Sequence, residues 1–101
     1  MEEQAYRASR LLRALGSPVR YSIVKELENR KMTPGELSAS LRRKVSTISD
    51  HLQVLRSLDI VRYEGRSGKV LYWLKYGDIL GILNTAEKCV SKMKLETSAL
   101  R

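Results

Sequence analysis

The sequence offers few side chains for covalent or metal chemistry. It contains one histidine, His51, and one cysteine, Cys89. A single residue of each kind excludes a disulfide framework within the chain and a four-ligand zinc site built from cysteine and histidine. Most catalytic sites need a base beside a nucleophile, and the sequence presents no such pair. We therefore predict that the protein is not an enzyme and has no metal site and no cofactor.

The charged residues predict a polyanionic partner. Lys and Arg number 19 against 11 Asp and Glu, which gives a formal net charge of +8. A small, strongly basic domain favours nucleic acid as the partner, with an anionic membrane surface second. Basic charge is concentrated in residues 60–75, where four cations oppose Glu64 alone, and in the cluster Arg42, Arg43 and Lys44.

The length and composition predict one ordinary folded domain spanning residues 1–101. The chain has 101 residues, 43% of them hydrophobic, and two prolines. No apolar run is long enough to cross a bilayer, and the first ten residues lack the apolar segment of a signal peptide. We therefore expect a cytoplasmic protein that does not bind a membrane.

Apolar spacing predicts four helices in the first part of the chain, over residues 3–15, 18–29, 34–42 and 46–57. Gly16 is expected to end the first helix in a left-handed conformation, and Ser17 to cap the second. Thr33 and Glu36 have the spacing of a capping box. The apolar stripes of these helices are Ala5, Ala8, Leu12 and Leu15; Val19, Ile23, Val24 and Leu27; Leu37 and Leu41; and Ile48, Leu52, Leu55 and Leu58.

From residue 60 the pattern changes to that of β-strands. Residues 60–64 and 69–74 are rich in β-branched and aromatic side chains, and Gly65-Arg66-Ser67-Gly68 between them suits a hairpin connection. Asp78 is expected to cap a final helix, whose stripe is Ile79, Ile82, Leu83, Ala86, Val90 and Met93. The predicted fold class is mainly α with a β-hairpin (α+β), a winged helix-turn-helix of four helices, a hairpin wing and a fifth helix.

The second helix of the helix-turn-helix is predicted to read double-stranded DNA. A helix fits the major groove and its exposed face reaches base edges, while a basic hairpin collects phosphate contacts beside it. With Ile48, Leu52 and Leu55 inward, small and hydrogen-bonding side chains face outward. The predicted recognition-helix residues are Ser46, Thr47, Ser49, Asp50, Gln53 and Arg56, and the predicted backbone and wing residues are Arg42, Arg43, Lys44, Arg62, Arg66, Ser67 and Lys69.

Two residues of this helix have several candidate roles. Asp50 could accept a hydrogen bond from cytosine N4, complement the positive end of the helix, or pair with Lys44, and the sequence does not distinguish these roles. His51 lies nearer the buried side of the helix. Packing or a phosphate contact is therefore favoured for His51 over a metal role.

Three stretches of the chain carry a resemblance to a known family. They are residues 11–24 (LLRALGSPVRYSIV), residues 45–56 with 58–61 (VSTISDHLQVLR and LDIV) and the wing residues 64–69 (EGRSGK). These stretches resemble the arsenic-repressor (ArsR) family, and the similarity spans about residues 5–76. The resemblance implies a dimeric bacterial or archaeal transcription regulator, usually a repressor of a palindromic operator. It implies DNA contacts at Ser46, Ser49, Asp50, Arg66 and Lys69, whereas Val45 stands where relatives often have glutamine for a base contact.

The sequence departs from the family at the metal sites. Ser38 and Ser40 occupy the positions of the Cys-x-Cys pair of arsenic sensors, and hydroxyls do not replace thiolates for soft metals. The last helix has Asp78 and Glu87 but none of the histidines that zinc sensors carry there. We therefore predict no metal sensing. Cys89 could oxidise across a dimer or be buried and inert, and the second role is favoured.

The terminal helices carry more apolar surface than a chain of this size easily hides. In the family these helices form the dimer interface, for which the candidates here are Tyr6, Leu11, Ile82, Leu83, Ala86 and Val90. Packing within a monomer is the alternative. The prediction is a sequence-specific DNA-binding repressor that acts as a homodimer, with a nonspecific architectural DNA binder or a protein–protein module as alternatives. The sequence leaves open whether a small-molecule or redox effector releases it.

Overall fold

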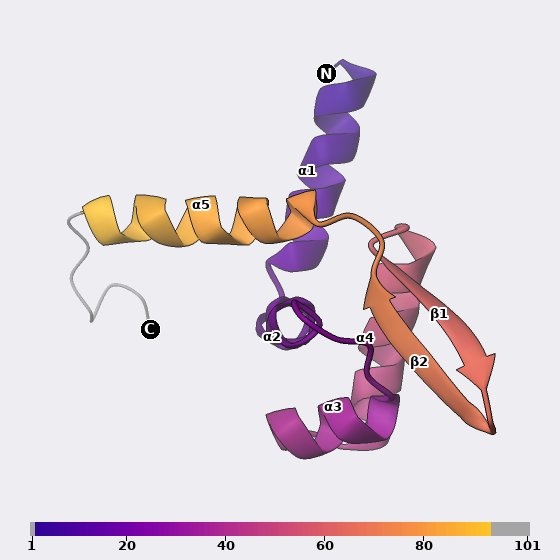
Figure 1. Cartoon of the computed structure of the whole chain (residues 1–101). Coiled ribbons are helices and arrows are strands. Elements are labelled where there is room, and N and C mark those ends of the chain that lie inside the picture. The colour runs from indigo at the N-terminus through magenta and orange to yellow at the C-terminus, as the bar shows by residue number, and fades with distance from the viewer. Residues whose placement is uncertain (1, 94–101) are drawn as a thin grey trace.

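The computed structural model describes residues 2–93, which form five helices and one β-hairpin (Figure 1). The elements are α1 (Glu3–Leu15), α2 (Pro18–Glu26), α3 (Pro34–Leu41), α4 (Val45–Ser57), β1 (Val61–Arg66), β2 (Lys69–Leu74) and α5 (Asp78–Lys92). Their types and order confirm the predicted winged helix-turn-helix. Figure 1 shows α1 and α5 extending, in different directions, beyond the group formed by the other helices and the hairpin.

Side-chain caps start the first three helices. Ser17 accepts a hydrogen bond from the amide of Arg20 (3.3 Å), and Thr33 and Glu36 exchange the two bonds of the predicted capping box (3.1 and 2.8 Å). Helix α1 uses Glu2, whose carboxylate accepts from the amides of residues 4 and 5. These bonds satisfy amides that have no partner inside their own helix, so the chain enters each helix at a defined residue.

The end of α1 and the start of α5 differ from the predictions. Gly16 is right-handed (φ −75°) because the chain turns directly into the next helix and needs no left-handed residue there. Left-handed residues follow two later helices instead: Arg42 (φ 56°) ends α3 and turns the chain toward α4, and Asp59 (φ 64°) stands just after α4. Asp78 is the first residue of α5 and not its cap; Gly77 stands at the cap position, and no side chain bonds to the helix start there.

The hairpin connection is tighter than predicted. β1 and β2 pair antiparallel with Arg66 opposite Lys69, so the connection is only Ser67 and Gly68. Both residues have positive φ (52° and 76°), as two-residue turns between twisted strands require. Gly65 and Arg66, predicted in the connection, therefore belong to β1.

One residue between α2 and α3 ties the hairpin to the helices. The amide of Met32 donates to the carbonyl of Tyr72 in β2 (3.0 Å), and the amide of Tyr72 donates back to Met32 (2.8 Å). This pairing gives a reason for α2 to end at Glu26 and not near Asn29 as predicted, because the chain must leave the helical conformation to reach β2. Strand β2 thus has a partner on each edge: β1 along one edge and Met32 on the other.

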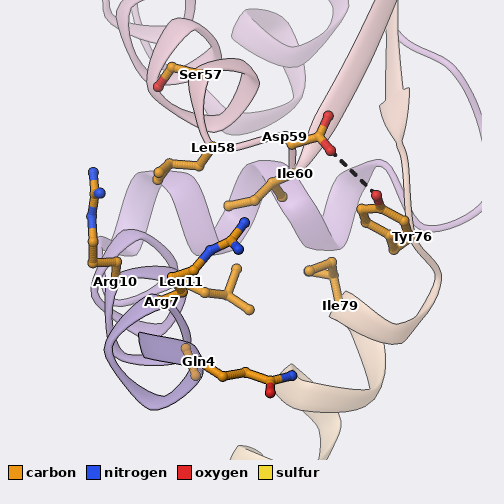
Figure 2. A pocket seen from close by; sticks show the side chains of 11 residues that line it. Gln4, Arg7, Arg10, Leu11, Ser57, Leu58, Asp59, Ile60, Tyr76 and Ile79 are labelled. Carbon is orange, nitrogen blue, oxygen red and sulfur yellow. Dashed lines mark hydrogen bonds between the residues drawn. The ribbon is translucent and has the colours of Figure 1, made fainter. Parts of the chain in front are cut away.

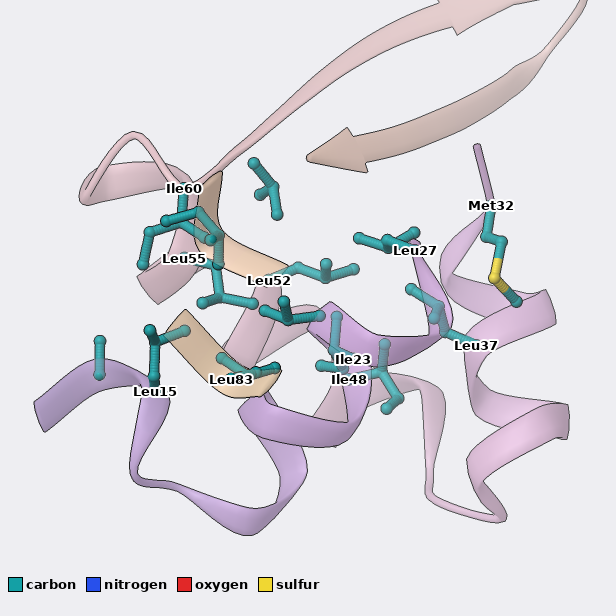
Figure 3. Close-up of a cluster of buried hydrophobic side chains, with 14 residues drawn as sticks. Leu15, Ile23, Leu27, Met32, Leu37, Ile48, Leu52, Leu55, Ile60 and Leu83 are labelled. Carbon is teal, nitrogen blue, oxygen red and sulfur yellow. The ribbon is translucent and has the colours of Figure 1, made fainter. Parts of the chain in front are cut away.

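The core is a cluster of buried apolar side chains from all five helices, β1 and the connections (Figure 3). Helix α4 contributes Ile48, Leu52 and Leu55, each 0% exposed. Leu41 and Leu58, predicted on inward stripes, are half-buried and pack at the edge of the cluster. The buried members are Ala14, Leu15, Ile23, Val24, Leu27, Met32, Leu37, Ile48, Leu52, Leu55, Ile60, Val61, Ile79 and Leu83.

The outer part of α1 lies outside this core. Only Ala14 and Leu15 of α1 are buried, whereas Leu12 is 55% exposed and Ala5 and Ala8 are exposed as well. Most of the stripe predicted for this helix therefore has no partner within the described chain. No helix within residues 2–93 is both long enough and apolar enough to cross a membrane.

A carboxylate on α5 is held by two side chains of α2. Glu87 accepts a hydrogen bond from the Tyr21 hydroxyl and forms an ion pair with Lys25 (3.0 Å). The hydrogen bond from Tyr21, followed by that from Lys25, lowers the pKa of Glu87, and the same Tyr21 bond raises the pKa of Tyr21. Because Glu87 lies one turn beyond the buried Leu83, this contact extends the attachment of α5 along the helix.

Replacing Glu87 with glutamine is expected to lower the melting temperature at neutral pH but not in acid. A carboxylate whose folded pKa is lowered stabilises the fold above its unfolded pKa and loses that contribution as the pH falls through the folded value. Thermal melts of wild type and Glu87→Gln between pH 7 and pH 3 should show a difference that closes in acid. Glu28→Gln is the matched control, since Glu28 is exposed and has no ion pair among the described residues. A difference that persists undiminished at pH 3 would contradict this role.

Candidate nucleic-acid interface

The outward face of α4 is a row of unoccupied hydrogen-bonding side chains. Ser46, Ser49, Asp50 and Gln53 are exposed, opposite the buried Ile48, Leu52 and Leu55, and Thr47 is half-buried at the edge of the row. Within residues 2–93 no side-chain hydrogen bond or ion pair involves Ser46, Ser49, Asp50 or Gln53. Their donors and acceptors are therefore available to a ligand along about two turns of helix.

Of the roles considered for Asp50, pairing with Lys44 does not occur. No ion pair between described residues involves Asp50. Asp50 is also the sixth residue of α4, beyond the first turn in which the helix dipole acts strongly, and that turn holds no acidic residue. The carboxylate is left facing outward, in the position from which it could accept a hydrogen bond from a base.

The turn between α3 and α4 concentrates positive charge at the start of α4. Arg42, Arg43 and Lys44 are all exposed, and Lys44 stands at the cap position of α4 without a side-chain cap bond. The hydroxyl of Ser38 donates to the carbonyl of Arg43 and so fixes the turn. The amides and dipole at the start of a helix add to the three cations, so this end of α4 attracts anions.

The tip of the wing presents a second group of cations. Arg66 and Lys69 face each other across the two-residue turn, and both are exposed together with Ser67. Arg66 lies 3.4 Å from the carboxylate of Glu64, but its side chain is 68% exposed, so this ion pair is weak and open to exchange. Arg62 is exposed further down β1.

Arg56, in the last turn of α4, makes a contact that the sequence analysis did not predict. Its guanidinium lies over the ring of Tyr63 in β1, 4.2 Å from the centroid. Tyr63 in turn stacks on Tyr72 of β2, with centroids 5.5 Å apart and planes inclined by 22°. The three side chains link α4 to the base of the wing. Only the strand register, which pairs Tyr63 with Tyr72, could have revealed this stack.

His51 is a structural residue within the helical body. It is half-buried, and its Nδ1 lies 3.1 Å from a terminal nitrogen of Arg20. Arginine only donates, so Nδ1 of His51 is the acceptor in this contact. Arg20 also donates to the carbonyl of Ala14 (2.7 Å), so one guanidinium joins α1, α2 and α4.

The positions of the family's metal ligands carry bonded hydroxyls. Ser38 donates to the Arg43 carbonyl, and Ser40 donates to the carboxylate of Glu26 (2.7 Å). On α5, Glu87 is engaged by α2, nine residues from Asp78. No group of three or more His, Cys, Asp or Glu side chains within residues 2–93 is arranged to hold a metal ion.

Two predictions for α5 need correction. Cys89, for which burial was favoured, is an exposed free thiol, because the whole of residues 84–93 is exposed beyond the buried Leu83. Leu83, predicted in a dimer interface, is 1% exposed and packs in the core of the chain itself. Tyr6 and Val90 are each 53% exposed, Ala86 is exposed, and Leu11 and Ile82 are half-buried.

A cavity of about 500 Å³ opens between α1, the turn after α4 and the start of α5 (Figure 2). Leu11, Leu58, Ile60 and Ile79 supply its apolar walls. Asp59 at its edge is engaged by Lys75 (2.7 Å) and by Tyr76 (3.3 Å), and the Lys75 contact lowers the pKa of Asp59. The apolar surface beneath the outer half of α1 is therefore not filled by the described chain.

Comparison with known proteins agrees with this geometry. A family model described as a helix-turn-helix domain matches residues 15–64. The chain is 37% identical over 67 residues to the HTH-type transcriptional repressor SmtB of Mycobacterium tuberculosis, an alignment that covers 66% of this chain and 50% of SmtB. The chain thus spans about half the length of the curated relatives it matches.

Solved structures extend the similarity over most of the chain. HlyU from Vibrio cholerae superposes with a TM-score of 0.79 at 27% identity, covering 88% of this chain and 97% of HlyU. The transcriptional repressor BigR from Xylella fastidiosa gives a TM-score of 0.74 at 26% identity and covers 96% of each chain. SmtB and BigR are both described as transcriptional repressors. With the helix-turn-helix match and the wing, they show that the chain belongs to the ArsR family of winged helix-turn-helix transcriptional regulators.

Proposed function

We propose that the protein binds double-stranded DNA sequence-specifically in the cytoplasm and represses transcription as a homodimer, without sensing a metal. The observation that carries this proposal is the row of free polar side chains on α4, Ser46, Ser49, Asp50 and Gln53, between two groups of exposed cations. Side chains of this kind match base edges, and cations at both ends match the phosphates that flank a groove.

In this proposal α4 lies in the major groove and the hairpin lies over the adjacent backbone or minor groove. Ser49 and Asp50 face the base edges, because they lie on the outward side of α4. Arg43 and Lys44 at one end and Lys69 at the wing tip contact phosphates. The phosphate contacts supply most of the affinity, whereas the helix face supplies the preference for one sequence.

The unfilled apolar surface of α1 and α5 supports the homodimer. On α5, Ala86 and Val90 continue the stripe of Ile79 and Leu83 at helical spacing, but they are exposed because nothing in the described chain lies beneath them. The cavity beside α1 and the exposed Tyr6 present further apolar surface. A second copy would cover these surfaces and set two recognition helices about 34 Å apart, which implies a palindromic site.

In this proposal the dimer represses transcription by occupying its operator. A dimer with two helices in successive major grooves excludes other proteins from the same stretch of promoter. The serine hydroxyls at positions 38 and 40 support a regulator that does not respond to soft metals, because a hydroxyl lacks the affinity of a thiolate for them.

The experiment that tests this function compares two duplexes across a salt series. One is the DNA upstream of the protein's own gene, and the other is a scrambled duplex of equal length. A preference of about a thousandfold or more supports a site-specific regulator. Equal affinity with a steep salt dependence would identify an architectural DNA binder, and no binding at low salt would leave a protein–protein module.

Substitutions on the wing and on α4 are expected to have different effects on DNA binding. Replacing both Arg66 and Lys69 with alanine should weaken binding to all sequences and lower the salt slope by about one for each phosphate that is no longer neutralised. Asp50→Ala should instead alter sequence preference, by about 1–3 kcal/mol at a single base pair. Binding titrations with a library of operator variants measure both the overall affinity and the sequence preference. If Asp50→Ala changed neither affinity nor preference, Asp50 would not face the bases.

A further inference from the structure

The contact between Arg56 and Tyr63 joins the two parts of the proposed DNA-binding surface. Arg56 lies in the last turn of α4, and Tyr63 lies in the first half of β1. The guanidinium carbon is 4.2 Å from the ring centroid, and the ring is backed by Tyr72 at 5.5 Å. The cross-strand pairing of Tyr63 with Tyr72 sets both rings on one face of the hairpin, so the platform beneath the guanidinium is held by two strands.

Stacking restricts the guanidinium without using its hydrogen bonds. An arginine that lies flat on an aromatic ring keeps its N–H groups in the plane and directed outward. No acidic side chain within residues 2–93 pairs with Arg56, whereas Arg66 at the wing tip shares Glu64 with Lys31. No acidic partner among the described residues therefore competes for the donors of Arg56, whose guanidinium carbon lies 4.2 Å from the ring centroid, and the exposed Tyr63 (41%) leaves the site open to solvent.

The position of this stack, at the end of α4 that adjoins the wing, suits a phosphate contact. Ser49, Gln53 and Arg56 have the i, i+4, i+7 spacing of a single helix stripe, so Arg56 continues the polar row at its C-terminal end, where it contacts Tyr63 of β1. A helix in the major groove and a wing beside it must be separated by one sugar–phosphate backbone. The junction of α4 and β1 faces that backbone.

From these observations we propose that Tyr63 is a positioning residue, which holds Arg56 as a preformed clamp for the backbone phosphate between the recognition helix and the wing. The inference rests on the proposed DNA binding. It adds that the clamp is ordered before DNA arrives, so little side-chain freedom is lost on binding. It also makes the aromatic stack of the hairpin part of the DNA-binding apparatus.

The test is a double-mutant cycle with the full-length protein on one operator duplex across a salt series. Arg56→Ala should weaken binding about tenfold and reduce the salt slope by about one. Tyr63→Leu should weaken binding about threefold in wild type but cause no further weakening when Arg56 is already alanine. Tyr63→Phe retains the ring face and should bind within about twofold of wild type.

Arg62→Ala serves as the control for general charge, because Arg62 neighbours Tyr63 on β1 but points to the other face of the strand. Its effect should add to that of Tyr63→Leu. The inference is overturned if the effects of Arg56→Ala and Tyr63→Leu add, if Tyr63→Phe is as weak as Tyr63→Leu, or if Arg56→Ala leaves the salt slope unchanged. Wild-type protein that binds no DNA would overturn the proposed function itself, and the inference with it.

Discussion

Leu52→Ala is expected to lower the free energy of unfolding by about 2–5 kcal/mol, a large part of the stability of a domain of this size. Leu52 is 0% exposed and sits in the middle of the core (Figure 3), where the loss of three carbons leaves a void that its neighbours cannot close fully. Because Leu52 is on α4, the same substitution weakens the packing of the helix that we propose lies in the major groove. DNA binding should weaken in proportion to the fraction unfolded.

The measurement is chemical denaturation followed by circular dichroism at one fixed protein concentration, since association also contributes to apparent stability. Gln53→Ala is the matched control, because Gln53 is the next residue of the same helix and is exposed. It should change stability by no more than about 0.5 kcal/mol. If Leu52→Ala cost as little as Gln53→Ala, the packing of α4 against the core would be wrong.

Signals that act within a few residues were sufficient to predict most of the elements. Ser17 and Thr33 cap the helices that were expected to follow them, because a cap is a contact between near neighbours in the chain. The two faces of α4 were predictable for the same reason, since helical spacing alone separates Ile48 and Leu52 from Ser49. The end of α2 was missed because a distant strand, through Met32, determines where the helix stops.

The contacts that fix the candidate site could not be predicted in this way. Placing Arg56 on Tyr63 requires the angle of the hairpin relative to α4, and joining Arg20 to His51 requires the packing of α2 against α4. Burial was wrongly favoured for Cys89 because a free cysteine is usually buried, and that general tendency does not reveal where a helix extends beyond the core. These contacts and exposures depend on how the elements pack in three dimensions, and they produce no periodic pattern in the sequence.

Val90→Asp is expected to convert a dimer into a monomer and to weaken operator binding by about a hundredfold or more. Val90 is 53% exposed on the stripe that begins with the buried Ile79 and Leu83, so a carboxylate there would be buried without a partner in the proposed interface. The fold of each chain should survive, because Val90 is not part of its core. In a dimer, binding of one subunit to its half-site raises the effective concentration of the second subunit at the other half-site. A monomer loses this advantage.

The control is Asn84→Asp, which adds the same charge about 120° away from Val90 around the axis of α5. Light scattering should give twice the chain mass of 11.5 kDa for wild type and the control, and the single mass for Val90→Asp. Binding to an isolated half-site should be equal in all three proteins, so the weakening should appear only on the palindrome. A Val90→Asp protein that remained dimeric would place the interface elsewhere. A monomeric wild type would instead mean that the exposed stripe of α5 serves another partner.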